Sequence, residues 1–147
     1  MLERMIGAAR LDVHVYEEVE ADTGATLQAM TVVVLVALAS GLGALGLGGG
    51  PMDVIFGVFT GLLSWAVWAF VTYVVGTTVF RTSETEANWG QLARTTGFAQ
   101  SPGVLRVFGF IPTIGQVIVF AVTLWQLVAM VIAVRQALDY TSTWRAV

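Results

Sequence analysis

The sequence contains no cysteine and no lysine, and long parts of it carry no charge. Without cysteine the chain has neither a disulfide framework nor a thiolate metal site. All seven basic residues are arginines, and they form no basic patch of the kind that neutralises nucleic-acid phosphates. Charged residues make up 12% of the chain, against about 25% in a typical soluble domain. These absences exclude a disulfide-rich secreted protein and argue against a nucleic-acid partner.

Charge is missing from three stretches in particular, residues 23–52, 54–80 and 107–134. A membrane-spanning helix needs roughly 20 mostly apolar residues to cross a hydrocarbon core of about 30 Å, so each stretch is long enough. The whole chain is 56% hydrophobic, with a mean hydropathy of +0.79. Its 147 residues form one compact unit. The sequence therefore predicts an all-α, polytopic transmembrane helical bundle.

The first 22 residues are rich in charge, unlike a secretory signal peptide, which opens with a basic region and a short apolar run. Apolar residues recur there at three- and four-residue spacing: Leu2, Met5, Ile6, Ala9, Val13 and Tyr16. This spacing predicts an amphipathic helix, which Asp12 would split by capping a second short helix. Residues 1–22 are therefore assigned to an amphipathic segment, either lying in the membrane interface or packed on the cytoplasmic ends of the bundle. Residues 23–147 form the transmembrane domain.

Three strong spans and one weaker, kinked span are predicted. They cover residues 25–45, 54–79, 92–110 and 113–134. The turn at 46–51 separates the first two spans, because four glycines and one proline in six residues end a helix. The third span is weaker because Arg94 and Arg106 interrupt its apolar character, and because Pro102 and Pro112 would bend or bound its helix.

The arginines indicate the topology, since they flank the cytoplasmic ends of spans. If residues 92–110 cross the membrane, six arginines fall on one side: Arg4, Arg10, Arg81, Arg94, Arg135 and Arg145. If they do not cross, Arg135 and Arg145 end up on the outside. The charge rule therefore favours four crossings with both termini in the cytoplasm.

Four crossings place Arg106 at membrane depth, where insertion scales put an arginine at about 2.5–3.5 kcal/mol unfavourable. Asp53, in the outer turn, is the nearest plausible acidic partner. The alternative is that Arg106 extends to the lipid headgroups near Pro112. A small transporter or channel would use Arg106 together with Gln116 and Gln126 along a polar path.

Small and aromatic side chains mark the candidate faces for helix packing. Small residues let helix backbones approach closely in lipid, and one pair of glycines forms a GxxxG pattern. The tryptophans fall near the middle of the second span, where they pack against neighbouring helices or contact a lipid or pigment. The candidate interface residues are Ala37, Gly41, Gly57, Gly61, Trp65 and Trp68.

The residues that catalysis needs are not visible in the sequence. The single histidine, His14, lies in the amphipathic segment and is expected to be solvated. The spans hold no pair of carboxylates, no glycine-rich loop opens onto a lysine, and no nucleophile and base can be paired. We therefore assign no catalytic, cofactor-binding or metal-binding residue and expect no enzyme activity.

Polar residues around the spans carry a resemblance to a known family. They are Asp12, Tyr16, Glu17, Glu20 and Asp22 ahead of Ala25 and Gln28, the stretch LARTTGFAQSPGVLRVFGFIPTIG over 92–115, and a C-terminal run that includes Trp125, Arg135, Asp139 and Arg145. In order and spacing this pattern resembles the prokaryotic branch of the Yip domain family. These are small polytopic membrane proteins named for eukaryotic members that interact with Rab-type GTPases.

The resemblance implies an α-helical bundle usually described with five spans, so that a final span would be expected after Val147. It implies no catalytic residue, and it favours a prokaryotic plasma membrane. Together with the composition, it favours a non-catalytic scaffold or accessory subunit of a larger membrane assembly, respiratory or photosynthetic for example. The expected partners are membrane lipid and other integral membrane proteins, with no nucleic acid and no small-molecule substrate.

Overall fold

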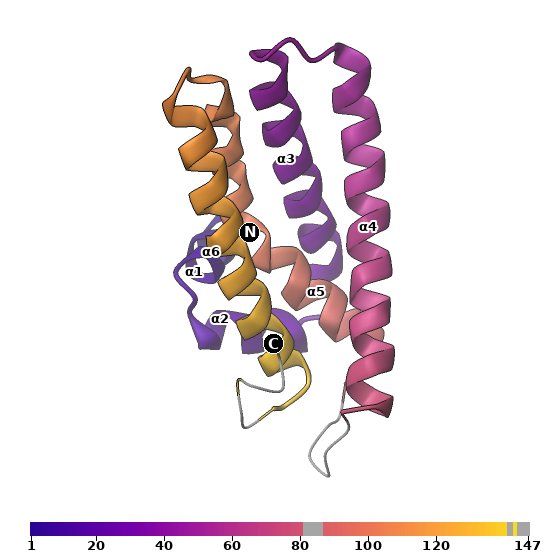
Figure 1. The fold of residues 1–147 in the computed structure, drawn as a ribbon. Coiled ribbons are helices and arrows are strands. Elements are labelled where there is room, and N and C mark those ends of the chain that lie inside the picture. Colours follow the sequence, from indigo (N-terminus) through magenta and orange to yellow (C-terminus); the bar gives the residue numbers. More distant parts are fainter. Residues whose placement is uncertain (81–86, 141–142, 144–147) are drawn as a thin grey trace.

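The computed structural model describes residues 1–80, 87–140 and 143. Within these residues the chain forms six α-helices and one 3-10 helix, η1 (Figure 1). Their bounds are α1 Leu2–Ala9, α2 Val13–Ala21, α3 Ala25–Leu45, α4 Pro51–Thr78, α5 Trp89–Ala99, η1 Ser101–Phe110 and α6 Ile114–Ala137. Of these, α3, α4 and α6 are long and apolar enough to cross a membrane. The predicted all-α helical bundle is confirmed.

The weaker third span, predicted over 92–110, is broken into two helices, α5 and η1, as its prolines predict. Pro102 stands at the start of η1, where its missing N–H and its restriction on the preceding residue end the α-helix. A 3-10 helix rises about 2.0 Å per residue, so the ten residues of η1 cover about 20 Å. In Figure 1, α5 and η1 together run from the end of the bundle that holds α2 and the C-terminal end of α6 to the end that holds the α3–α4 turn. The chain then returns beside η1 as α6.

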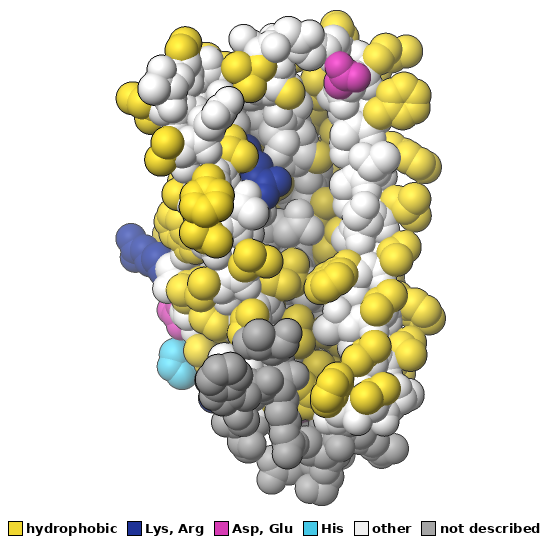
Figure 2. Space-filling view, in the orientation of Figure 1, with side chains coloured by type: hydrophobic (Ala, Val, Ile, Leu, Met, Phe, Trp, Pro, Cys, Tyr) yellow, Lys and Arg dark blue, Asp and Glu magenta, His cyan; other side chains and the backbone are white. Residues whose placement is uncertain are grey.

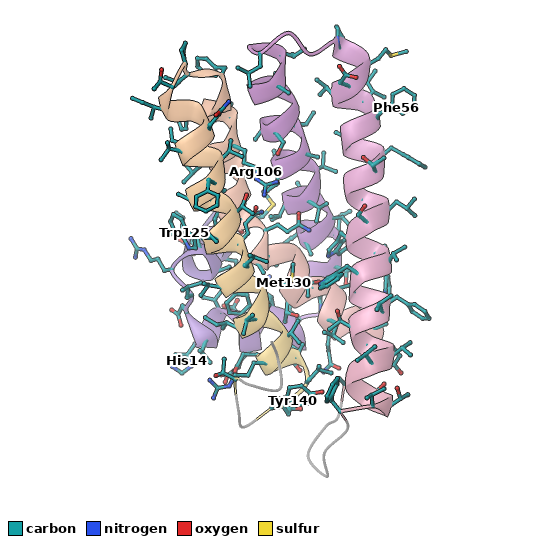
Figure 3. All side chains as sticks on the ribbon, in the orientation of Figure 1. His14, Phe56, Arg106, Trp125, Met130 and Tyr140 are labelled. Carbon is teal, nitrogen blue, oxygen red and sulfur yellow. The ribbon has the colours of Figure 1, made fainter. Side chains whose placement is uncertain are left out.

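The buried core lies toward the end of the bundle that holds α2. Its largest fully buried side chains include Tyr16, Leu92, Phe98 and Leu138, from α2, α5 and the residue after α6. By contrast, α4 buries few residues, and large apolar side chains such as Phe56 point away from the bundle (Figures 2 and 3). An outer surface of this kind suits hydrocarbon rather than water.

The amphipathic segment folds as two helices, as predicted. Leu11 adopts a left-handed conformation (φ 64°), and the Asp12 carboxylate accepts a hydrogen bond from the His14 N–H at 3.0 Å, capping α2. Both helices pack on the bundle: α1 lies against α5 and η1, and α2 lies against α5 and α6. The Trp125 indole N–H of α6 donates to the Ala9 carbonyl at 2.8 Å and holds the end of α1.

Candidate functional site

Arg94 joins α5 to α2 and α3 at the end of the bundle that holds α2. Its side chain is only 6% exposed. Its guanidinium donates to the carbonyl oxygens of Val19, at 3.0 Å, and Glu20, and to the Thr26 hydroxyl at 3.5 Å. The last carbonyls of a helix have no partner within that helix, and its C-terminal end favours a cation. Arg94 of α5 therefore supplies the capping groups that α2 lacks.

Charged and polar side chains extend this contact into a network. Arg4 forms ion pairs with Glu18 at 2.7 Å and with Asp22 at 2.8 Å. The Gln91 amide donates to the Glu20 carboxylate at 3.0 Å. We call this set, with Arg94, the polar junction.

The family-like residues of the sequence cluster around the polar junction. The buried Tyr16 hydroxyl donates to the Ala8 carbonyl at 3.0 Å, and Arg135 donates to the Tyr140 carbonyl at 3.2 Å. Asp139 takes a left-handed conformation just after α6 (φ 51°). Arg145 and Arg81 lie outside the described residues. Tyr16 thus ties α2 to α1, and Arg135 fixes the chain just after α6.

Two carboxyls of the polar junction have shifted pKa values. Burial, reinforced by the nearby Asp139 and Glu17 charges and opposed by Arg94, raises the pKa of Glu20 to about 7. A hydrogen bond from Arg4, together with one from the Gly24 N–H, holds the pKa of Asp22 below its usual value. Glu20 is therefore the acidic group of this network that changes charge near neutral pH.

Arg106 lies inside the bundle, on η1. Its guanidinium donates to the Thr123 hydroxyl of α6 at 3.2 Å, while its Nε is buried and has no hydrogen-bond partner. Thr123 lies well inside α6, so the guanidinium is not placed at the membrane end near Pro112. A Cβ atom at Gly43 would overlap the Arg106 carbonyl oxygen, so this glycine lets η1 approach α3 closely and sets the position of Arg106.

The expected pairing of Arg106 with Asp53 is wrong. The Asp53 carboxylate instead accepts a hydrogen bond from the Gly50 N–H at 2.7 Å and completes the capping box of α4. No ion pair between Arg106 and any acid occurs within the part of the chain that the structure describes. The capping geometry keeps Asp53 at the end of α4, although both residues line one cavity of about 400 Å³.

Three adjoining cavities that share lining residues follow α4 along its side toward η1 and α6, and α3 lines the first of them. The cavity beside Asp53 shares Gly61, Ser64 and Arg106 with a second cavity of about 430 Å³. The second shares Trp68 and Met130 with a third of about 400 Å³. We call this the α4–α6 groove; it is marked along its length by Asp53, Ser64, Arg106, Gln126, Met130 and Tyr140. Figure 2 shows the hollow between α6 and α4, and Figure 3 places Arg106 in it.

Gln116 and Gln126, the other two predicted polar residues, each share a cavity with Arg106. Arg106 and Gln116 line a largely apolar cavity of about 530 Å³ between α3, η1 and α6. Arg106 and Gln126 line the middle of the α4–α6 groove. Gln126 also donates to the Gln100 carbonyl at 3.1 Å, which ties α6 to the break between α5 and η1.

The predicted packing residues divide between the α3–α4 contact and the groove. A Cβ at Gly41 would meet the Val54 side chain at 3.0 Å, and one at Gly61 would meet the Ala37 Cβ at 3.4 Å, whereas one at Gly57 would meet no atom within 4 Å. The two tryptophans also differ in their surroundings. Trp65 is buried and donates to the Ala93 carbonyl at 3.1 Å, and Trp68 is 55% exposed along the groove.

Sequence reasoning missed the role of Arg94. The sequence indicates Arg94 as a charge that weakens the third span and helps to orient the spans. Its acceptors are backbone carbonyls far away in the sequence, so its residue type does not reveal them. His14 is exposed, as expected, and lies 3.5 Å from the Glu17 carboxylate.

Comparison with known proteins gives one match. The Yip1 domain family model matches residues 13–147, which is nearly the whole chain. No curated protein sequence and no solved structure matches it.

Proposed function

Because the chain belongs to the Yip1 domain family, we propose that it is a non-catalytic scaffold or accessory subunit of a larger membrane assembly. Its three long apolar helices indicate an integral membrane protein. The observation that carries the proposal is the α4–α6 groove. Along it α4, which packs against α3 and α5, scarcely touches α6. An open groove between spanning helices offers a place for a further element.

The chemistry of the membrane supports this proposal. Helices in lipid associate through close packing and polar contacts, since the hydrocarbon gives no hydrophobic force between them. The groove offers both, in the small residues of α4 and in the polar groups around Arg106. The Yip1 family is not a known family of enzymes.

Copurification tests the role. The tagged protein, extracted in a mild detergent, is expected to retain one or more integral membrane proteins in a fixed molar ratio, measured by native mass spectrometry. The variant Phe56→Leu, altered on the outward face of α4, serves as a matched control that keeps the same partners. If the protein is recovered without any partner in several mild detergents, the accessory role is contradicted. The identity of the partners decides whether the assembly is an energy-converting one.

A small transporter or channel is the second candidate, favoured by the meeting of Arg106 with Gln116 in one cavity and with Gln126 in another. Flux of a small ion or solute through reconstituted liposomes that is lost in Arg106→Ala would establish it. If the liposomes stay as impermeable as protein-free ones, the transporter or channel function is contradicted.

We further propose that both termini face the cytoplasm of a prokaryotic plasma membrane. Arginines mark the cytoplasmic ends of spans. The described arginines that support this orientation lie in or beside α1, α5 and α6: Arg4, Arg10, Arg94 and Arg135. Because the sequence has no cysteine, single cysteines report topology cleanly. Leu47→Cys should react with a membrane-impermeant maleimide from outside intact cells, and Glu3→Cys should react only after lysis. The opposite labelling pattern would reverse the orientation.

A further inference from the structure

The α4–α6 groove has the length of a spanning helix. It begins at Asp53, in the first turn of α4, and reaches Tyr140, just beyond the end of α6. The 28 residues of α4 measure about 42 Å at 1.5 Å per residue, while the hydrocarbon core is about 30 Å thick. A groove of this length suits a whole helix better than a compact solute.

The walls of the groove suit a closely packed helix. Gly57, Thr60 and Ser64 give one wall small side chains, and the space in front of Gly57 is open. Small residues on a spanning helix let another backbone approach closely. Further along, Trp68 and Met130 provide larger apolar surface for side chains of the incoming element.

Arg106 gives the groove a charge that the described chain does not balance. Its Nε is buried without a hydrogen-bond partner, and its guanidinium is bonded to Thr123 on one side only. Asp53 is held by the Gly50 N–H at the end of α4. Charged groups in spanning segments pair with opposite charges or with backbone carbonyls, so an anionic group, a carboxylate or a phosphate, complements this site.

The depth of Arg106 favours a helix over a lipid as the source of that carboxylate or anion. Its partner Thr123 lies about 14 Å along α6 from Ile114, at 1.5 Å per residue, which is near the middle of that helix. Lipid phosphates lie at the boundary of the hydrocarbon, about 15 Å from its centre. A side chain in the middle of a spanning helix reaches this depth directly.

We propose that the α4–α6 groove receives a membrane-spanning helix of a different protein that carries an Asp or Glu near its middle, and that this carboxylate pairs with Arg106. A second copy of this sequence does not supply the acid, because residues 54–80 and 107–134 carry no charge. This inference rests on the proposed accessory role and adds the site and the chemistry of the partner.

Synthetic helices test the inference directly. The full chain is reconstituted in phosphatidylcholine vesicles with a fluorescent, leucine-rich helix of about 23 residues that has one central Glu, or Gln in the matched control. Binding is measured by energy transfer to a dye on Leu47→Cys. The Glu helix should bind roughly five- to tenfold more tightly than the Gln helix, as expected for an intramembrane polar contact. In Arg106→Met the two helices should bind equally, and Arg106→Lys should restore part of the difference. Equal binding of both helices to the unsubstituted protein overturns the proposal.

A groove-filling variant keeps the test valid if Arg106→Met fails to fold. Gly57→Leu puts a side chain into open space within the groove and leaves Arg106 in place. It should weaken the binding of both helices, whereas Phe56→Leu, on the outward face, should leave binding unchanged. Unchanged binding in Gly57→Leu overturns the proposed site.

Competition by phosphatidylglycerol that abolishes the preference for Glu would identify a lipid as the occupant and also overturn the proposal. Stoichiometric partners that survive Arg106→Met and Gly57→Leu would contradict the site but leave the accessory role standing.

Discussion

Arg94 and Arg106 occupy one kinked segment of the chain and yet have opposite surroundings. Arg94 donates to two backbone carbonyls and a hydroxyl and is almost fully buried. Arg106 donates to one hydroxyl and keeps a buried Nε without a partner. The comparison shows how the acceptors around an arginine decide whether its donors are all used in holding helices together or one of them stays unpaired.

The difference follows from which parts of other helices each arginine faces. Arg94 meets the C-terminal end of α2, where the last carbonyls lack partners within the helix. Arg106 meets the middle of α6 at Thr123, where backbone carbonyls are already bonded within the helix and only side chains can accept. The end of a helix therefore offers free backbone acceptors to a buried cation, whereas the middle of a helix does not.

The largest expected effect comes from removing each guanidinium in turn. Arg94→Met should lower the free energy of unfolding by about 2–4 kcal/mol, because it strips the partners from buried carbonyls. Arg106→Met should change it by less than about 1 kcal/mol, since the lost bond is single and a buried charge is removed with it. Unfolding in detergent by increasing sodium dodecyl sulfate, followed by tryptophan fluorescence, measures both. If the free energy of unfolding falls equally in the two variants, the two arginines contribute equally to the fold and the comparison is wrong.

An intermediate effect is expected from pH, through Glu20 at the polar junction. Its pKa in the folded protein, about 7, lies above the ordinary value of 4.5. The folded state therefore binds this proton more tightly, so the contribution of Glu20 to stability is fully present below pH 4.5 and is lost as the pH rises through 7. The full difference corresponds to about 3 kcal/mol, which partial exposure reduces to ~1–2 kcal/mol.

Glu20→Gln keeps an acceptor for Gln91 and removes the titration. This variant should be more stable than the unsubstituted protein at pH 8 and should lose the slope between pH 4.5 and 7. Arg106→Met, remote from the junction, should keep that slope. Detergent unfolding at a series of pH values checks both, and a slope retained in Glu20→Gln would assign the titration to another group.

The smallest expected effect belongs to the ion pair at the surface of the polar junction. Glu18→Gln removes one partner of Arg4, whose other contacts, with Asp22 and Gln28, remain. The loss should be about 0.5 kcal/mol at low salt and should vanish near 1 M salt, because exposed ion pairs are weak and screened. A loss as large as that of Arg94→Met would mean that the outer charges, rather than Arg94, hold the junction.

Span positions follow closely from the sequence, with deviations that have local causes. The predicted span 25–45 coincides with α3. The next helix begins at Pro51 rather than 54, because proline fits the first turn of a helix, where no N–H is needed. α6 continues to Ala137, beyond the predicted end at 134, where Arg135 suits the helix dipole. The break in the third span at Pro102 was also foreseeable.

The candidate site was foreseeable only in part. Arg106 stood out because a charge in an apolar stretch is costly wherever it falls. Its acidic partner was misassigned because Asp53 is the nearest acid outside the uncharged stretches, whereas its carboxylate is already committed to the first turn of its own helix. The role of Arg94 escaped prediction because its acceptors, Val19 and Glu20, are main-chain atoms that no residue type reveals.

Uncharged length, capping residues and proline act locally along the chain, so the sequence alone predicts an all-α membrane protein, the number and approximate bounds of its long helices, and the break between α5 and η1. Only the tertiary structure decided that α4 stands apart from α6, that Arg94 is satisfied and that Arg106 faces an open groove. Those outcomes depend on which helix faces meet, and that is settled by packing between segments far apart in sequence.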